Sequence, residues 1–338
     1  LKIGPFETYH YSNGSLKQKG NYNTFFSNQP YDVYPDGWIE DYYDNGQLEY
    51  KRYVEGNDST KEYFVYYENG QLNEKGNYSQ KILDNEGTYE YVKTGLREGY
   101  FDDGTERLKE LYDDNGNLEG ETFEYDLDYN GKKRLILRGF YKNGKRDGEF
   151  FFYQEQLKKI YISNYKNGLR EGKDLTINNV KSIDEKGNYK GTINEKGSYK
   201  IINSKNNPKS VEDGLWEYYD SYSGDLSNKG MFKIVDYGDG NQESGKDGWW
   251  EYYDDNNNLE KKILYNKNLK KIVIVYHSSY NSGYGWFGEF ENGYEVTTFN
   301  IKEDKFGYVS YERNKSDYIV YKEEYFLNGK QYKRNIFL

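Results

Sequence analysis

The sequence lacks cysteine and alanine altogether, and it contains only four prolines, two histidines and one methionine. The absence of cysteine excludes disulfides, thiolate metal sites and cysteine nucleophiles. The absence of alanine, the strongest helix former, beside abundant Tyr, Phe, Ile and Thr disfavours a mostly helical fold. No apolar run approaches the roughly 20 residues of a membrane-spanning helix. The sequence therefore predicts a chain of β-strands with no transmembrane segment.

Acidic residues outnumber basic ones by 57 to 47, which gives a formal net charge of −10. This balance disfavours binding to a phosphate backbone, so we expect no nucleic-acid partner, although a local basic patch can still exist. The sequence begins at Leu1 and not at Met, so an export signal or lipid anchor can precede it. The compartment is not determined; an exported or cell-surface location is favoured slightly over a cytoplasmic one.

Aromatic residues are unusually common, with 42 Tyr, 17 Phe and 5 Trp. A disordered chain is poor in such residues, because it does not bury enough apolar surface to offset the entropy lost on folding. Each buried aromatic side chain removes roughly 150–250 Å² from water, worth at most about 4–6 kcal/mol. Aromatic burial is therefore expected to form the core of a chain that is poor in Leu and Val.

Internal repetition is the strongest pattern in the sequence. Four short phrases recur and follow one another in a unit of about 23 residues. The phrase Tyr-Lys-Asn-Gly-x-Arg-x-Gly occurs at 141–148 and 165–172, and Gly followed by aromatic residues and Glu-x-Tyr begins at Gly37, Gly214 and Gly248. Turn phrases ending in Gly-x-Leu occupy 43–48, 67–72 and 112–118, and Leu-x-x-x-Gly-x-aromatic begins at Leu16, Leu72, Leu135 and Leu226.

Each unit has the pattern of a β-hairpin. Asn-Gly between two apolar runs supplies the positive φ angles that tight hairpin turns need. Alternation along a strand places Trp216 with Tyr218, and Trp250 with Tyr252, on one face of the sheet. The glycine of the fourth phrase is expected to lie beneath an aromatic ring from a neighbouring strand.

A single hairpin is only marginally stable in water, so successive units are expected to pair edge to edge. We therefore predict an all-β fold, an elongated antiparallel sheet built from tandem β-hairpin repeats. Residues 1–338 are predicted to form a single continuous array of about ten repeats. Irregular insertions are expected near 79–97, 173–211 and 268–285.

The combination of these phrases resembles the MORN-repeat variant family of bacterial proteins. That resemblance covers most of the chain and is weakest over 173–211 and 268–320. It implies a solenoid of Tyr-rich β-hairpins. Family members are often labelled antitoxins, and related eukaryotic repeats are linked to lipid association, scaffolding and dimerisation. The family has no residue signature for these roles that transfers to positions of this chain.

Several polar motifs have spacings that occur in reactive or metal-binding sites. Asp113, Asn115, Asn117 and Glu124 have the spacing of a calcium loop, but Leu118 occupies the position that needs Gly, so an ordinary turn is the preferred interpretation. The glycines at 283, 285 and 288 match a dinucleotide fingerprint without the required following helix.

The sequence positions of the Glu and His candidates also favour structural roles over catalytic ones. Glu40, Glu217 and Glu251 recur at equivalent repeat positions, which favours cross-strand pairing with Lys or Arg over catalysis. His10 and His277 each stand alone in the sequence and are interpreted as turn or surface residues. We therefore predict no catalytic residues, no bound metal and no cofactor.

The aromatic faces are the best candidates for binding. Trp249 and Trp250 are adjacent, so they must point to opposite faces of a strand, and one sheet does not bury both against the same core. The alternative is that an insertion covers the second ring. The candidate binding residues are Trp38, Trp216, Tyr218, Trp249, Trp250, Tyr252 and Trp286.

These observations favour a non-enzymatic scaffold that binds another protein through an extended aromatic-rich sheet. The alternative is a cell-envelope or glycan-binding array that stacks Trp and Tyr rings on sugars, as the aromatic phrases of choline- and glucan-binding modules do. A third interpretation, a cytosolic antitoxin, follows from the family resemblance alone. The oligomeric state is not predicted by the sequence.

Overall fold

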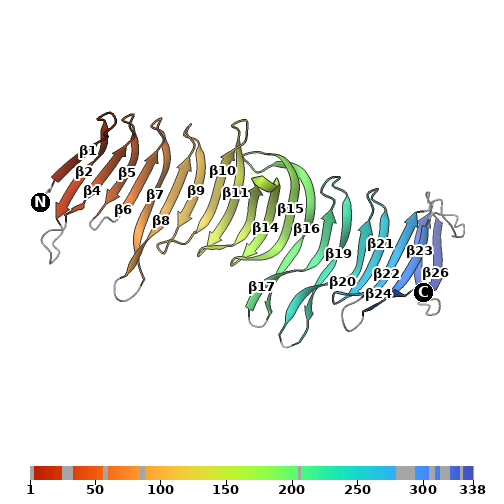
Figure 1. Cartoon of the computed structure of the whole chain (residues 1–338). Coiled ribbons are helices and arrows are strands. Elements are labelled where there is room, and N and C mark those ends of the chain that lie inside the picture. The colour runs from red at the N-terminus through yellow and green to blue at the C-terminus, as the bar shows by residue number, and fades with distance from the viewer. Residues whose placement is uncertain are drawn as a thin grey trace. The chain divides into compact units, whose positions relative to one another are not determined.

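The fold is almost entirely β. The computed structural model describes residues 4–24, 33–55, 60–83, 88–204, 207–238, 240–278, 294–303, 309–312, 320–327 and 330–337. Within these ranges the only helix is one 3-10 turn, η1 (Glu155–Leu157). All other elements in these ranges are strands, and neighbouring strands pair antiparallel, as Figure 1 shows. The predicted all-β fold of tandem hairpins is confirmed.

The chain divides into two compact units. Unit 1 contains Leu1–Arg170 and Ile177–Gly191, and unit 2 contains Glu171–Thr176 and Thr192–Leu338. Strands β15 (Leu169–Ile183) and β16 (Tyr189–Ser204) contribute residues to both. The boundary therefore lies in the longest segment that the sequence predicts as an insertion. That all repeats act as one array stays a prediction.

In unit 1 the strands pair in chain order from β1 to β14, with β3 and β12 as short additional strands. Their bounds are β1 (Gly4–Tyr9), β2 (Leu16–Thr24), β3 (Val33–Pro35), β4 (Gly37–Tyr42), β5 (Leu48–Val54), β6 (Thr60–Tyr66), β7 (Leu72–Ile82), β8 (Tyr89–Tyr100), β9 (Glu106–Tyr112), β10 (Gly120–Leu127), β11 (Lys133–Lys142), β12 (Lys145–Arg146), β13 (Gly148–Gln154) and β14 (Lys159–Lys166).

In unit 2 the order continues from β16 through β18 to β24, and β17 is an additional strand on β16. The remaining hairpin, β25–β26, pairs within itself. Their bounds are β17 (Asn207–Glu212), β18 (Gly214–Tyr219), β19 (Leu226–Asp236), β20 (Gln242–Tyr253), β21 (Leu259–Asn266), β22 (Leu269–Ser278), β23 (Tyr294–Glu303), β24 (Val309–Glu312), β25 (Val320–Leu327) and β26 (Lys330–Phe337).

The turns use the conformations that Asn-Gly favours. At Asn143-Gly144 both residues have positive φ angles, +50° and +72°, as a two-residue hairpin loop requires. The Asn167-Gly168 loop has the same form, with angles of +50° and +84°. In the longer turn at 43–47, Gly46 alone carries a positive φ, of +84°.

Glycines beneath aromatic rings form the core contacts that the sequence predicts. A β-carbon built on Gly230 would lie 2.2 Å from the Trp250 indole, and one built on Gly139 would lie 2.2 Å from the Phe150 ring. The same contact occurs between Gly20 and Phe6 and between Gly76 and Tyr63. Gly197 lies equally close beneath Trp216. This fifth contact was missed because Gly197 belongs to the predicted insertion.

The first part of that insertion folds back onto unit 1. The N–H of Leu135 donates to the Asp184 carbonyl oxygen at 3.1 Å, and the N–H of Val180 donates to the Lys158 carbonyl oxygen at 3.0 Å. The adjacent side chains of Phe150 and Phe151 are both buried, although alternation points them to opposite faces. Residues 177–191 therefore cover a patch that would otherwise face solvent.

Candidate interaction surface

Two faces of the sheet differ in accessibility within each unit. We call the inner face the one that holds the buried residues Ile39, Trp216 and Trp250. The outer face holds the residues one position earlier, Trp38, Leu215 and Trp249. Of these, Trp38 and Leu215 are exposed, and Trp249 is half-buried. An accessible binding surface must therefore be sought on the outer face.

Four of the predicted binding residues belong to the inner face of unit 2. Trp216 and Trp250 are 2 % and 0 % exposed, and their indole N–H groups donate to the carbonyl oxygens of Ser198 and Met231 at 3.1 and 3.2 Å. Tyr218 and Tyr252 are half-buried and pack against Trp250. These four residues form core contacts in this structure.

Basic side chains of the protein lie over the inner-face rings. The Lys246 ammonium lies 3.9 Å from the centroid of the Trp250 ring and 5.3 Å from that of Tyr265. Arg146 occupies the equivalent position in unit 1, 5.0 Å from the centroid of Phe150. Such cation–π contacts stabilise the packed ring and occupy the face that a cationic ligand would need.

The exposed predicted residue is Trp38. Its side chain is 38 % exposed and contacts Tyr53, which is 37 % exposed, with 5.4 Å between ring centroids. Phe64 lies 6.1 Å from Trp38, and the Lys51 ammonium lies 4.6 Å from the centroid of the Trp38 ring. We call Trp38, Tyr53 and Phe64 the aromatic platform. Trp286 lies outside the described residues.

Sequence reasoning missed Tyr53, Phe64 and Lys51. The signal that identifies Tyr53 is hairpin register, because Tyr53 lies directly opposite Trp38 in the β4–β5 ladder. Counting outward from the Asn45-Gly46 turn gives this pairing only when the bulge between Asp41 and Tyr42 is known. Other exposed apolar residues follow the same face, with Leu96 opposite Leu111 in unit 1 and Leu215 opposite Met231 in unit 2.

Charges beside the platform are paired within the chain. The Glu40 carboxylate lies 2.9 Å from Lys19 Nζ and 3.1 Å from Lys51 Nζ, and it accepts a hydrogen bond of 2.6 Å from the Tyr42 hydroxyl. Burial alone would raise the pKa of Glu40, but these three hydrogen bonds outweigh it and lower the pKa to about 2. Glu40 is therefore a stable anion that is bonded at both carboxylate oxygens.

The same pairing recurs in unit 2. Glu217 binds Lys196 at 2.6 Å, and Glu251 binds Lys229 at 3.2 Å and Lys262 at 3.1 Å. The hydroxyls of Tyr219 and Tyr253 donate to these carboxylates, as Tyr42 does in unit 1. The prediction that Glu40, Glu217 and Glu251 make cross-strand ion pairs is confirmed.

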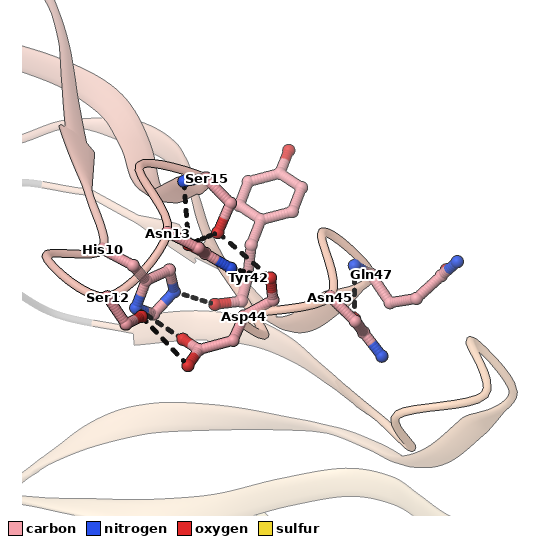
Figure 2. Close-up of polar contacts among 8 residues, drawn as sticks. All are labelled: His10, Ser12, Asn13, Ser15, Tyr42, Asp44, Asn45 and Gln47. Atoms are coloured by element: carbon pink, nitrogen blue, oxygen red, sulfur yellow. Dashed lines mark hydrogen bonds and ion pairs between the residues drawn. The ribbon is translucent and has the colours of Figure 1, made fainter.

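His10 lies in a turn, within the group of side chains that Figure 2 draws. Its Nδ1 lies 2.8 Å from an Asp44 carboxylate oxygen, and its Nε2 lies 2.9 Å from the Tyr42 carbonyl oxygen. The Ser12 hydroxyl contacts Asp44 at 3.4 Å and has no bond to the imidazole. Because both imidazole nitrogens face acceptors, neither is placed to activate Ser12.

The contacts of His10 belong to a repeated set that joins successive turns. Tyr43 and Tyr67 begin the next two turns of this edge, and their hydroxyls donate to the carbonyl oxygens of Tyr66 and Tyr100 at 2.7 and 2.9 Å. A parallel set of hydrogen bonds comes from Asn side chains. The amides of Asn13, Asn45 and Asn69 donate to the carbonyl oxygens of Asp44, Glu68 and Asp102, respectively. We call this set the turn ladder. The side chain of His277 lies outside the described residues.

The Asp113 carboxylate makes its hydrogen bonds within its own turn. Its carboxylate accepts hydrogen bonds from the N–H of Asn115 at 2.9 Å and from the N–H of Asn117 at 2.8 Å. Among the residues that the structure describes, no three His, Asp or Glu side chains are grouped to hold a metal ion. Over the same residues, no helix has the length and apolar character needed to cross a membrane.

Comparisons with known proteins find little similarity to this chain. No family model matches the sequence, and no curated protein matches it. The crystal structure of TcdB2-TccC3-Cdc42 aligns with 91 % of this chain at 10 % identity and a TM-score of 0.19, and that of TcdB2-TccC3 without hypervariable C-terminal region aligns with 96 % at 11 % identity and a TM-score of 0.15. This chain spans 16 % and 20 % of those two chains. Similarity at this level carries no functional argument.

Proposed function

We propose that this protein is a non-enzymatic, MORN-like repeat scaffold that binds another protein through the outer face of unit 1. The observation that carries the proposal is the aromatic platform, in which Trp38 and Tyr53 touch and are both more than a third exposed. Trp and Tyr are enriched among the residues that dominate binding energy at protein interfaces. Their large rings bind at a low cost in conformational entropy.

The chemistry around the platform supports a particular kind of partner. Lys19 and Lys51 both pair with Glu40, so the surface offers apolar contact and little unpaired charge. A partner therefore needs an apolar segment with a neutral or evenly charged rim. A sugar ring would stack on the face of Trp38, where the Lys51 ammonium lies, which disfavours the glycan alternative.

The absence of enzymatic activity is part of the proposal. Glu40, Glu217 and Glu251 repeat one environment, each with Lys and a Tyr hydroxyl, whereas acid–base catalysis needs two groups whose pKa values are pushed apart. The imidazole of His10 is used by the turn ladder and makes no bond to the Ser12 hydroxyl.

The proposal is tested by crosslinking in cells followed by quantitative binding. A photocrosslinking residue at position 53 should trap a partner that the same residue at position 129, an exposed turn Tyr, does not. The identified partner, once purified, should bind Trp38→Ala and Tyr53→Ala at least tenfold more weakly than the unmodified protein. Tyr129→Ala is the matched control and should bind normally.

If the partner bound both platform variants as tightly as the unmodified protein, the proposal that it binds through the aromatic platform would be refuted. Quenching of Trp fluorescence by cell-envelope oligosaccharides, lost in Trp38→Ala and without any trapped protein, would favour the glycan alternative instead.

A further inference from the structure

Four basic side chains gather at one end of two neighbouring hairpins of unit 1. Lys142, Lys145, Arg146 and Lys166 flank the turns at 143–144 and 167–168, and all four are exposed. We call them the basic corner. It stands out in a chain whose net charge is −10. The outer-face lysines described above pair with Glu, and Lys166 lies 3.4 Å from Asp147, whereas Lys142 and Lys145 follow a different pattern.

A like-charge pair occupies the hairpin ladder at this corner. Lys142 lies directly opposite Lys145, at the last pair before the turn. Like charges in directly opposed positions destabilise a hairpin, and elsewhere this sheet places Lys opposite Glu, as in Lys19 opposite Glu40. Folding of the hairpin therefore does not explain two lysines in these positions.

The nearby carboxylates are engaged by the backbone of the turns. Glu119 accepts a hydrogen bond of 2.7 Å from the Asn143 N–H, and Asp147 accepts one of 3.3 Å from the Asn167 N–H. The bond from Asn167 is the main cause that lowers the pKa of Asp147, which also lies 3.4 Å from Lys166 Nζ. Among the described residues, Lys142 and Lys145 have no carboxylate oxygen within ion-pair distance.

The corner is rigid at its base. The Gly168 N–H donates to the Arg146 carbonyl oxygen at 2.8 Å, which ties one turn to the next hairpin. A β-carbon built on Gly168 would lie 3.6 Å from Lys145 Cβ, so the stem of Lys145 packs along that turn. Side chains whose stems are held in place lose less entropy on binding.

We propose that the basic corner docks an acidic segment of a partner protein, whose Asp or Glu carboxylates pair with Lys142 and Lys145. This site is separate from the aromatic platform. A short segment fits better than a long polyanion. Carboxylates on one side of an extended segment recur about every 7 Å, which matches a patch two or three strands wide. A nucleic acid or an anionic membrane would extend beyond the corner and meet the net negative charge of the rest of the chain.

The test uses the full chain and a fluorescein-labelled octaglutamate peptide. The peptide should bind the unmodified protein, and binding should weaken at least tenfold when the salt concentration rises from 50 to about 300 mM, because exposed ion pairs are screened. The double variant Lys142→Glu, Lys145→Glu should bind at least tenfold more weakly at low salt. The variant Lys17→Glu, Lys181→Glu makes the same change in net charge at exposed lysines elsewhere in unit 1 and should stay within twofold.

Two further measurements separate this proposal from misfolding and from the proposed function. Lys142→Glu alone replaces the like-charge pair with an attractive one, so its thermal midpoint should rise while its affinity for the peptide falls. Trp38→Ala should bind the peptide normally. Equal loss of peptide binding in both double variants would show that overall charge, and not the basic corner, causes the binding. Normal peptide binding by Lys142→Glu, Lys145→Glu would overturn the proposal. The proposal would also be overturned if single-stranded DNA or phosphatidylserine vesicles bound the same lysines more tightly than the peptide does.

Discussion

Glycine beneath an aromatic ring supplies much of the inner-face packing in this protein. A ring that lies flat on bare backbone removes a large apolar area from water without a second layer of sheet above it. Trp250 is fully buried in this way, over Gly230, with Tyr218 and Tyr252 packed beside it. The glycine is required by the close approach of the ring.

Gly230→Ala is therefore expected to destabilise unit 2. The added methyl would lie 2.2 Å from the indole of Trp250, so the ring must leave its position or the strand must shift. Overpacking of this kind costs about 1–3 kcal/mol, sometimes more. Chemical denaturation monitored by Trp fluorescence should show a lower midpoint for the variant.

A second substitution shows whether the clash is the cause. In Trp250→Leu the ring is absent, so adding Gly230→Ala should cost much less than it does in the unmodified protein. Equal costs in the two backgrounds would mean that the glycine is needed for some other reason.

Glu40 gives the stability of unit 1 a defined pH dependence. The pKa of Glu40 is about 2 in the folded protein, below its ordinary value of 4.5, so the ionised form stabilises the fold. That contribution is fully present above about pH 5 and is lost as the pH falls towards 2. Because the ion pairs are partly exposed, we expect about 1 kcal/mol.

The measurement compares Glu40→Gln with the unmodified protein by denaturation at pH 7 and at pH 2.5. The variant should be less stable at pH 7, and the difference should narrow at pH 2.5. A difference that is constant with pH would show that Glu40 stabilises the fold by packing and not by its charge.

At the scale of the hairpin, the turn ladder links each repeat to the next. Backbone pairing already joins neighbouring strands, and the Asn and Tyr side chains add bonds at the strand ends, where pairing would otherwise fray. His10 occupies the Tyr position in the first turn of this edge. The recurring Asn thus has a role beyond its tolerance of positive φ.

Asn45→Ala is expected to loosen the turn that follows it. The Asn45 side chain donates to the Glu68 carbonyl oxygen at 3.1 Å and accepts from the Gln47 N–H at 2.9 Å. Loss of both bonds should cost about 1–2 kcal/mol locally. Hydrogen exchange measured by mass spectrometry should become faster over residues 43–47 and 67–71.

Asn130→Ala is the matched control. Asn130 also precedes the glycine of a turn on the same edge, but it participates in the described hydrogen bonds only through its backbone N–H. Its replacement should leave exchange in neighbouring turns unchanged. Faster exchange in both variants would indicate that the turn conformation is what matters, and not the bond between repeats.

At the scale of the whole molecule, stability is expected to be distributed along the strands of each unit. In repeat proteins each unit contacts its neighbours, so a local defect spreads over a limited distance. Trp250→Ala removes a fully buried ring and should cost about 3–5 kcal/mol in its own region. Hydrogen exchange should rise sharply in β18–β21 and stay unchanged in β4–β7. Uniform loss of protection across both units would instead indicate a single cooperative domain.

Much of the fold follows from patterns that depend on near neighbours in sequence. Asn-Gly turns, period-2 alternation and the spacing of Leu, Gly and aromatic residues predict the hairpins, the face that Trp216 shares with Tyr218 and the pairing of Glu40. The predicted site was less complete. Trp38 is accessible, but Tyr53 and Lys51 beside it were missed, since the bulge that sets the register has no clear sequence signal.

The sequence by itself determines the all-β character, the hairpin repeat, the glycines that lie beneath rings and the Glu–Lys pairs, because each arises within one strand or between adjacent strands. The tertiary structure alone decides which rings remain accessible. Phe151 is buried and lies against Gly187 of the segment 177–191, whereas Trp38 stays exposed on the same kind of strand. Accessibility depends on which distant segment folds back over a face, and local periodicity carries no information about that contact.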